Sequence, residues 1–232
     1  MMAWFAPETS GSLFGIQFSG QGAGGPGVPM QIVLLLTALT LLPAAVMSVT
    51  PFLRIVIVLH FLRQALGTQT APSNQVLVGL ALFLTILIMQ PVLGEAYTKA
   101  YQPMEKGEIT SQQAWERAAI PFKDFLLRFA RERDLKLFLE LSHSPQPAKP
   151  QDIGLAVLIP AYTLSELKAA FQIGAVLFLP FLCIDLVVAS VTLSVGMMQL
   201  PPVMVSAPFK ILLFVLVDGW NLVVGSLVKS FY

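Results

Sequence analysis

The chain has 232 residues, of which 56% are hydrophobic and only 12% are charged, with a formal net charge of +1. A soluble domain carries about a quarter charged residues, so this composition indicates a membrane protein. The small net charge gives no reason to expect a nucleic-acid partner. A single cysteine, Cys183, excludes an internal disulfide. His60 and His143 lie far apart with no cluster of ligands around them, so we expect no metal and no cofactor.

Residues 1–29 are rich in glycine and small polar side chains and are predicted to form a flexible N-terminal arm. Gly20, Gly22 and Gly25 match the GxGxxG pattern of dinucleotide-binding loops. No strand precedes these glycines and no βαβ unit follows them, so we interpret the pattern as a linker. The arm lacks a basic start and an uninterrupted apolar stretch, so we expect no signal peptide.

Four apolar segments follow, each long enough to cross a membrane, which takes about 20 residues. They cover residues 30–53 (with an apolar continuation to residue 62), 75–94, 171–200 and 203–228. Each segment contains proline: Pro43 and Pro51, Pro91, Pro180, and Pro208. Proline lacks a backbone donor, so helices kink or end there. We therefore predict an all-α fold without a sheet, with kinked N-terminal apolar helices in residues 30–94 and a C-terminal apolar helical hairpin in residues 151–232.

The last two apolar segments contain the charged residues Asp185, Lys210 and Asp218. One charge at mid-membrane costs about 2.5–3.5 kcal/mol on insertion scales, so these side chains should face protein or water. They are either a proton or ion relay, or structural pairs between helices or subunits. Lys210 and Asp218 lie two helical turns apart and cannot pair with each other, so each needs another partner, such as Asp185 for Lys210. We favour structural pairing.

Residues 95–150 form a polar insert, since 17 of the 27 charged residues lie between Glu95 and Lys149. Thr110 with Gln113 fits a capping box, and Pro121 suits the first position of a helix. An apolar stripe with helical spacing follows: Phe122, Phe125, Leu126 and Phe129. We predict a small amphipathic helical domain. The distribution of Lys and Arg does not assign its side of the membrane.

The residues offer no enzymatic motif: no G-x-S-x-G, no phosphate loop and no zinc signature. Ser165, Glu166 and Lys168 are close in sequence, but their spacing defines no oxyanion hole. We expect no enzyme. Three functions stay open on this evidence: a protein-conducting channel subunit, a small-molecule or ion transporter, and a membrane anchor. Transporters often contain inverted repeats, and residues 31–94 and 171–232 show no convincing similarity.

Four stretches resemble the FliP family of export-gate proteins, which includes homologues from virulence type III secretion. They are Arg63–Gly67 with Pro72–Gln75 and Ala81–Thr85, Pro160–Gly174, Pro180–Val187 leading to Gly196–Met198, and Pro208–Trp220. The resemblance covers roughly residues 31–232 and fits the flagellar branch better. Two departures from the flagellar pattern are expected: members usually begin with a cleavable signal peptide, which we do not expect here, and Gln199 occupies a position where many members have a third methionine.

The resemblance implies a channel for unfolded flagellar proteins in the bacterial inner membrane, within the flagellar basal body. It implies a ring of five copies together with FliR, FliQ and FlhB, and an assembly displaced toward the periplasm. Glu166 and Lys168 join Asp185, Lys210 and Asp218 as charges expected to be buried for assembly. No ATP site or enzymatic step is implied.

Met197, Met198 and Gln199 lie between Gly196 and the Pro201–Pro202 pair, where a turn between helices is expected. Methionine is a flexible filler of apolar cores, and that is the general interpretation. The resemblance favours another, because related gates place a methionine-rich loop at the channel constriction. An apolar constriction blocks the passage of ions because water leaves it, and this property suits a channel constriction.

Overall fold

The computed structural model describes residues 12–13, 16–17, 28–68, 70–143, 147, 149–196 and 201–232. The chain divides into two compact units, Met1–Ala45 and Val46–Tyr232. The first unit contains strands β1 (Ser12–Leu13) and β2 (Ile16–Gln17), which pair antiparallel, and most of helix α1 (Val28–Val49). The glycines of the GxGxxG pattern and most of the predicted arm lie outside the described residues.

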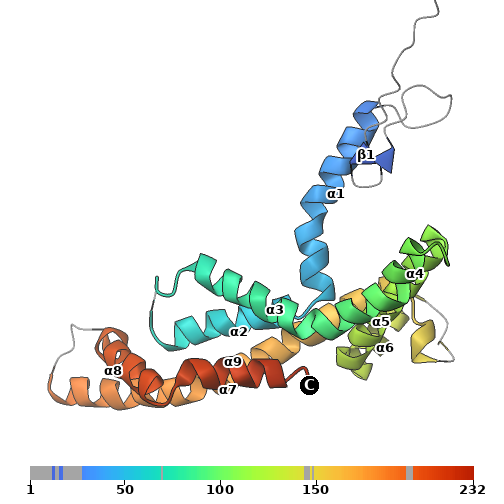
Figure 1. Ribbon diagram of the computed structural model, residues 1–232. Helices are drawn as coiled ribbons and strands as arrows, with labels where there is room; N and C mark the ends of the chain where they lie inside the picture. Colours follow the sequence, from blue (N-terminus) through green and yellow to red (C-terminus); the bar gives the residue numbers. More distant parts are fainter. Residues whose placement is uncertain are drawn as a thin grey trace, which may run out of the picture. The chain divides into compact units, whose positions relative to one another are not determined.

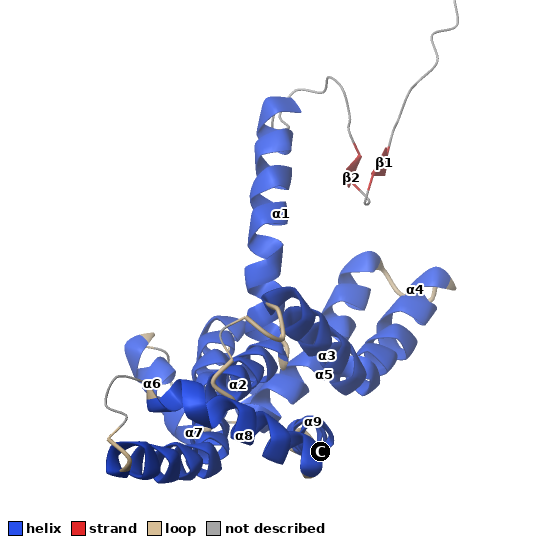
Figure 2. Ribbon diagram, turned by 90° about the vertical axis from the view of Figure 1, so that its left-hand side faces the viewer, coloured by secondary structure: helices blue, strands red, loops and turns tan. Residues whose placement is uncertain are grey.

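The regular secondary structure among the described residues of the second unit is all helical (Figures 1 and 2). Its elements are α2 (Phe52–Ala65), α3 (Asn74–Ala96), a π-helical turn η1 (Tyr97–Tyr101), α4 (Gln102–Glu105), α5 (Ser111–Phe129), α6 (Glu132–Leu141), a 3-10 turn η2 (Pro150–Asp152), α7 (Leu155–Ser194), α8 (Pro202–Leu216) and α9 (Gly219–Lys229). The all-α prediction is confirmed. The departure from it among the described residues is the two-residue pairing of β1 with β2.

The first predicted apolar segment forms two helices because the chain turns at Thr50 and Pro51. Helix α1 carries no charged residue, and its side chains are exposed from Ile32 to Met47. Helix α2 differs, because half of its residues are buried in the core of the second unit. The apolar continuation to residue 62 is thus a core helix that packs against α3 and α7.

The third predicted segment, 171–200, has the wrong start. Helix α7 begins sixteen residues earlier, at Leu155, and runs for 40 residues through Pro160 and Pro180. Proline removes one backbone hydrogen bond but leaves the rest of the helix intact, and α7 also packs against α2, α5, α6 and α8. Segment four is broken instead: α8 and α9 meet at an angle of 67°.

In the polar insert, α5 begins with the predicted capping box. The Thr110 hydroxyl accepts from the Gln113 amide, and the Gln113 side chain accepts from the Thr110 amide. Pro121 is not at a first helical position, as was predicted, but in the middle of α5. The helix tolerates it because the carbonyl group that loses its partner belongs to Arg117, which is exposed to water.

One hydrophobic core joins the hairpin α2–α3, the insert helix α5 and the helices α7 and α9. The predicted stripe of α5 supplies Phe125 and Leu126 to this core, against Tyr162 of α7. Helices α2 and α7 approach closely at Gly174, where an added Cβ would lie 2.5 Å from Cδ2 of Phe61. The division into arm, N-terminal helices, insert and C-terminal hairpin stays a prediction.

Candidate functional site

Arg54 of α2 and Glu166 of α7 form the first of three polar clusters along α7. Both side chains are almost completely buried, with exposed fractions of 7% and 0%. Nε of Arg54 donates to Oε2 of Glu166 at 2.9 Å, and Nη2 donates to Oε1, so the pair is bidentate. Nη1 donates to the carbonyl group and the hydroxyl group of Ser230, and the guanidinium stacks 3.9 Å above the Phe231 ring. Arg54 thus ties α2, α7 and the residues after α9 together.

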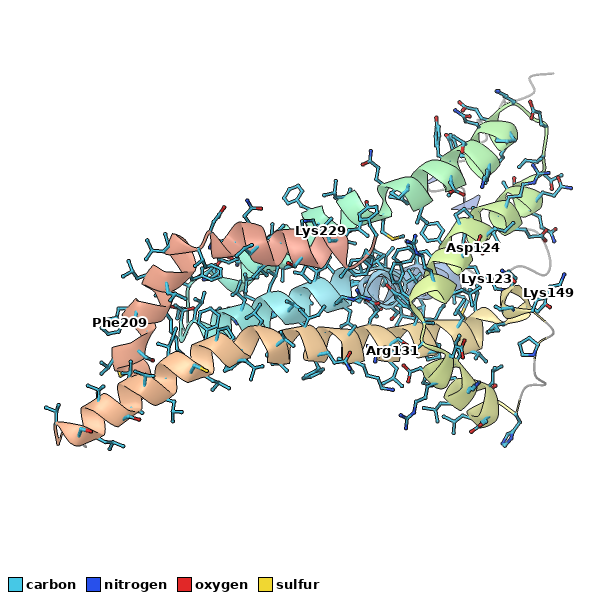
Figure 3. All side chains as sticks on the ribbon, turned by 90° about the horizontal axis from the view of Figure 1, so that it is seen from below. Lys123, Asp124, Arg131, Lys149, Phe209 and Lys229 are labelled. Atoms are coloured by element: carbon cyan, nitrogen blue, oxygen red, sulfur yellow. The ribbon has the colours of Figure 1, made fainter. Side chains whose placement is uncertain are left out.

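Asp134 of α6 is the centre of the second cluster. Its carboxylate is 1% exposed and accepts hydrogen bonds from Lys168 and from the Ser165 hydroxyl, the latter at 2.8 Å. The Ser165 hydroxyl in turn accepts from the backbone amide of Arg131, at the junction of α5 and α6 that Figure 3 labels. Burial raises the pKa of Asp134, but the hydrogen bonds from Lys168 and Ser165 and the charges of Lys168 and Arg131 outweigh it and lower the pKa.

The third cluster joins α7, α8 and the end of α2. Nζ of Lys210 donates to Oδ2 of Asp185 at 2.6 Å and to the carbonyl oxygen of Ala65 at 3.0 Å. The Ser206 hydroxyl donates to Oδ1 of Asp185 at 2.5 Å. Lys210 is buried, whereas the Asp185 side chain keeps 23% of its surface exposed. The pairing of Lys210 with Asp185 that the sequence suggested is present.

Asp218 stands apart from these clusters. It is exposed in the single chain, and its carboxylate accepts a hydrogen bond from the Asn221 amide at 3.2 Å. Its backbone is left-handed, with φ of 51°, directly before α9. Its expected burial between subunits, like the role of the three clusters in assembly, stays a prediction.

Met197, Met198 and Gln199, the predicted constriction, lie outside the described residues. The structure describes the chain on both sides of them. Helix α7 ends at Ser194, followed by a left-handed Gly196, and α8 begins at Pro202 after an extended Pro201. The predicted position between two helices therefore agrees with the described flanks.

The sequence interpretation missed three contributors: Arg54 as a buried partner, Asp134 and Ser206. Arg54 gave a signal, because it is the single charge between Glu8 and Arg63, and a lone charge in an apolar segment marks a buried pair or a site. Asp134 and Ser206 gave none, because their partners lie 21 to 34 residues away in the sequence.

These clusters are suited to holding helices together. Each carboxylate is paired with a cation: Glu166 accepts both of its hydrogen bonds from Arg54, whereas Asp134 and Asp185 each accept a further one from a serine hydroxyl. Among the described residues, no group of three or more His, Cys, Asp or Glu side chains is placed to hold a metal ion. The arrangement therefore favours a structural role for the charges over a relay.

Three helices of the described chain are long and apolar enough to cross a membrane: Met30–Val49, Asn74–Glu105 and Leu155–Ser194. The bent pair α8–α9 would be a fourth if it acts as one span. Much of this apolar surface is exposed in the single chain. Long apolar helices that are connected by buried ion pairs are typical of a helical membrane protein.

The comparisons give the family. The sequence profile of the FliP family matches residues 35–227. The chain is 51% identical over 233 residues to the flagellar biosynthetic protein FliP of Pectobacterium carotovorum subsp. carotovorum, covering 100% of this chain and 90% of the relative. It is 50% identical to the FliP of Bacillus subtilis (strain 168), covering 87% and 91%, and 45% identical to that of Aquifex aeolicus (strain VF5), covering 87% and 85%. The chain belongs to the FliP family.

Proposed function

We propose that this chain is a subunit of the flagellar type III protein export gate and forms part of the channel through which unfolded flagellar proteins cross the bacterial inner membrane. FliP proteins are components of the flagellar export apparatus. The observation that carries the proposal is the family match over most of the chain, which includes all three polar clusters of α7. This family match favours a role in protein export over the alternative role as a transporter of small molecules or ions. The subunit acts as a structural component and catalyses no reaction.

The exposed apolar surface supports assembly with other chains. A soluble monomer rarely exposes large contiguous apolar patches, whereas here most large side chains on the outer faces of α1, α3, α7 and α8 are exposed. The location of the subunit is membrane-associated and flagellar. The finer proposal is a ring of five copies in the inner membrane that binds FliR, FliQ and FlhB, with the assembly displaced toward the periplasm.

Co-purification tests the assembly. The tagged chain, expressed with its neighbouring export genes and extracted in mild detergent, should elute as a ring-shaped particle that contains FliR and FliQ. Imaging of single particles counts the copies. A chain that elutes as a stable monomer or dimer and binds a small solute would contradict the proposal.

Leakage tests the proposed constriction. Met197→Ala together with Met198→Ala should increase the leak of ions or small solutes through the assembled gate, because smaller side chains leave the constriction wider and wetter. Met104→Ala, a substitution in the insert, is the matched control and should leave the leak unchanged. An unchanged leak in the double variant, with the particle intact, would return both methionines to an ordinary packing role.

A further inference from the structure

Helix α8 presents an unusual buried face. The residues of α8 that are buried are Ser206, Lys210 and Phe214, spaced four apart on one stripe. Its outward face is apolar and exposed, as Figure 3 shows for Phe209. The exposed apolar residues are Val203, Met204, Phe209, Ile211, Leu212, Leu213, Val215 and Leu216. Two of the three side chains that attach α8 to the body are therefore polar.

The polar attachment is directional and concentrated at one point. Asp185 of α7 accepts from both Ser206 and Lys210, at 2.5 and 2.6 Å. Lys210 also donates to the carbonyl oxygen of Ala65, the last residue of α2, at 3.0 Å. A cation at the C-terminal end of a helix interacts favourably with the free carbonyl groups there. One lysine thus connects α8 to two different helices.

The opposite end of α8 is a sharp turn. Helices α8 and α9 form an angle of 67°, and Asp218 between them is left-handed with φ of 51°. An added Cβ on Gly219 would lie 2.2 Å from the ring of Phe214, so the turn folds the chain tightly over the last buried residue of α8. Helix α8 is therefore a short helix that is attached by a polar contact in its N-terminal half and ends in a tight turn.

We propose that Asp185, Ser206 and Lys210 form a latch that positions α8, and that opening this latch frees α8 to turn about Val217–Gly219 while the core of the subunit stays folded. Water can replace hydrogen bonds and ion-pair contacts, whereas separating an apolar core exposes surface that water does not stabilise. The main core contains no residue of α8, so releasing the latch leaves that core intact. Phe214, in the last turn of α8, belongs to a smaller apolar cluster with Leu62, Ala65, Leu66 and Phe181, and this contact lies next to the turn about which α8 moves. The use of this movement during export rests on the proposed function, but the latch itself does not.

Hydrogen–deuterium exchange on the purified full chain in detergent tests the latch. Lys210→Met keeps the length of the side chain and removes its charge and donors. It should accelerate amide exchange in residues 202–216 by about 150- to 4,000-fold, the range of factors that corresponds to losing one partner of a buried pair. Exchange around Arg54 and Glu166 should stay at the wild-type rate. Lys229→Met, an exposed lysine in the last turn of α9, is the matched control and should change neither region.

Two further variants separate a latch from simple charge compensation. Ser206→Ala removes one hydrogen bond without leaving a cation unpaired, and it should accelerate exchange in α8 by about tenfold. Asp185→Leu with Lys210→Met removes both charges, so it leaves no uncompensated charge. A latch predicts that α8 still exchanges fast in this double variant, because no directional contact remains. Compensation alone predicts recovery of the wild-type rate.

The proposal is overturned if exchange in α8 keeps its wild-type rate in Lys210→Met and Ser206→Ala, if all regions accelerate together, or if the double variant recovers. Its failure is distinct from failure of the proposed function. If α8 exchanges slowly in the variants and the chain still assembles with FliR and FliQ, the latch proposal alone is refuted. If α8 exchanges fast in the variants but the chain assembles with no export component, the proposed export function is refuted and the latch proposal stands.

Discussion

Glu166→Gln should be among the most destabilising single substitutions in this chain. The substitution keeps the shape of the side chain and removes the charge that faces Arg54. Arg54 is 7% exposed, and its bidentate partner would become a neutral amide with one oxygen and one nitrogen. The amide nitrogen would then face a guanidinium donor, so one hydrogen bond is lost and a buried cation stays uncompensated.

The expected cost follows from the burial of the pair. Breaking a buried ion pair by removing one partner costs about 3–5 kcal/mol. Arg54 keeps its contacts with Ser230 and Phe231, so we expect the lower half of that range. For a chain of this size, 1 kcal/mol corresponds to about 2–4 °C in the melting temperature, and the shift should be about 6–16 °C.

Thermal unfolding of the purified chain in detergent measures the shift, with Glu116→Gln as the matched control. Glu116 is an exposed glutamate on α5, so its substitution should change stability by less than about 0.5 kcal/mol. A shift in Glu166→Gln no larger than that of the control would refute the reasoning, since the pair would then contribute no more than a surface charge.

Two further predictions test the packing and the insert. Gly174→Ala should destabilise the chain by about 1–3 kcal/mol, because the added Cβ would lie 2.5 Å from the Phe61 ring. At Gly94 an added Cβ would have no atom within 4 Å, so Gly94→Ala should stabilise α3 slightly. Thermal unfolding measures both effects. Asp134 has a lowered pKa in the folded chain, so its contribution to stability is complete above the unfolded pKa of about 3.9 and is lost as the pH falls through the folded pKa. Wild-type stability should therefore fall more steeply below about pH 4 than that of Asp134→Asn, and equal slopes in acid denaturation would contradict the Asp134–Lys168 contact.

Local signals in the sequence predicted much of this fold. The capping box at Thr110 and Gln113 involves residues three apart, so the sequence contains the whole interaction. The stripe that includes Phe125 and Leu126 identified the buried face of α5 for the same reason. The apolar segments required only length and composition, and these indicated helices long enough to cross a membrane.

Most contacts between residues far apart in the chain could not be predicted from the sequence. Arg54 and Glu166 are 112 residues apart, and no periodicity connects them. Pro121 was predicted to start a helix because a proline usually avoids helix interiors, but the capping box at Thr110, eleven residues earlier, already begins α5. The pairing of Asp185 with Lys210 was accessible because few charges occur in the apolar segments, so few partners were possible.

The three clusters share a feature that explains why an apolar protein retains them. Each has a charged member on α7: Glu166, Lys168 or Asp185. Helix α7 is apolar on most of its circumference, and such a helix gains little from one rotation or axial position over another. An ion pair changes this, because a shift of one turn would leave a buried charge without its partner. Glu166 and Asp185 are 19 residues apart, about 28 Å along the helix. Contacts at two points so far apart fix both the rotation and the axial register of α7 against α2 and α8. We therefore infer that the charges specify position along an apolar helix whose hydrophobic surface alone would allow several.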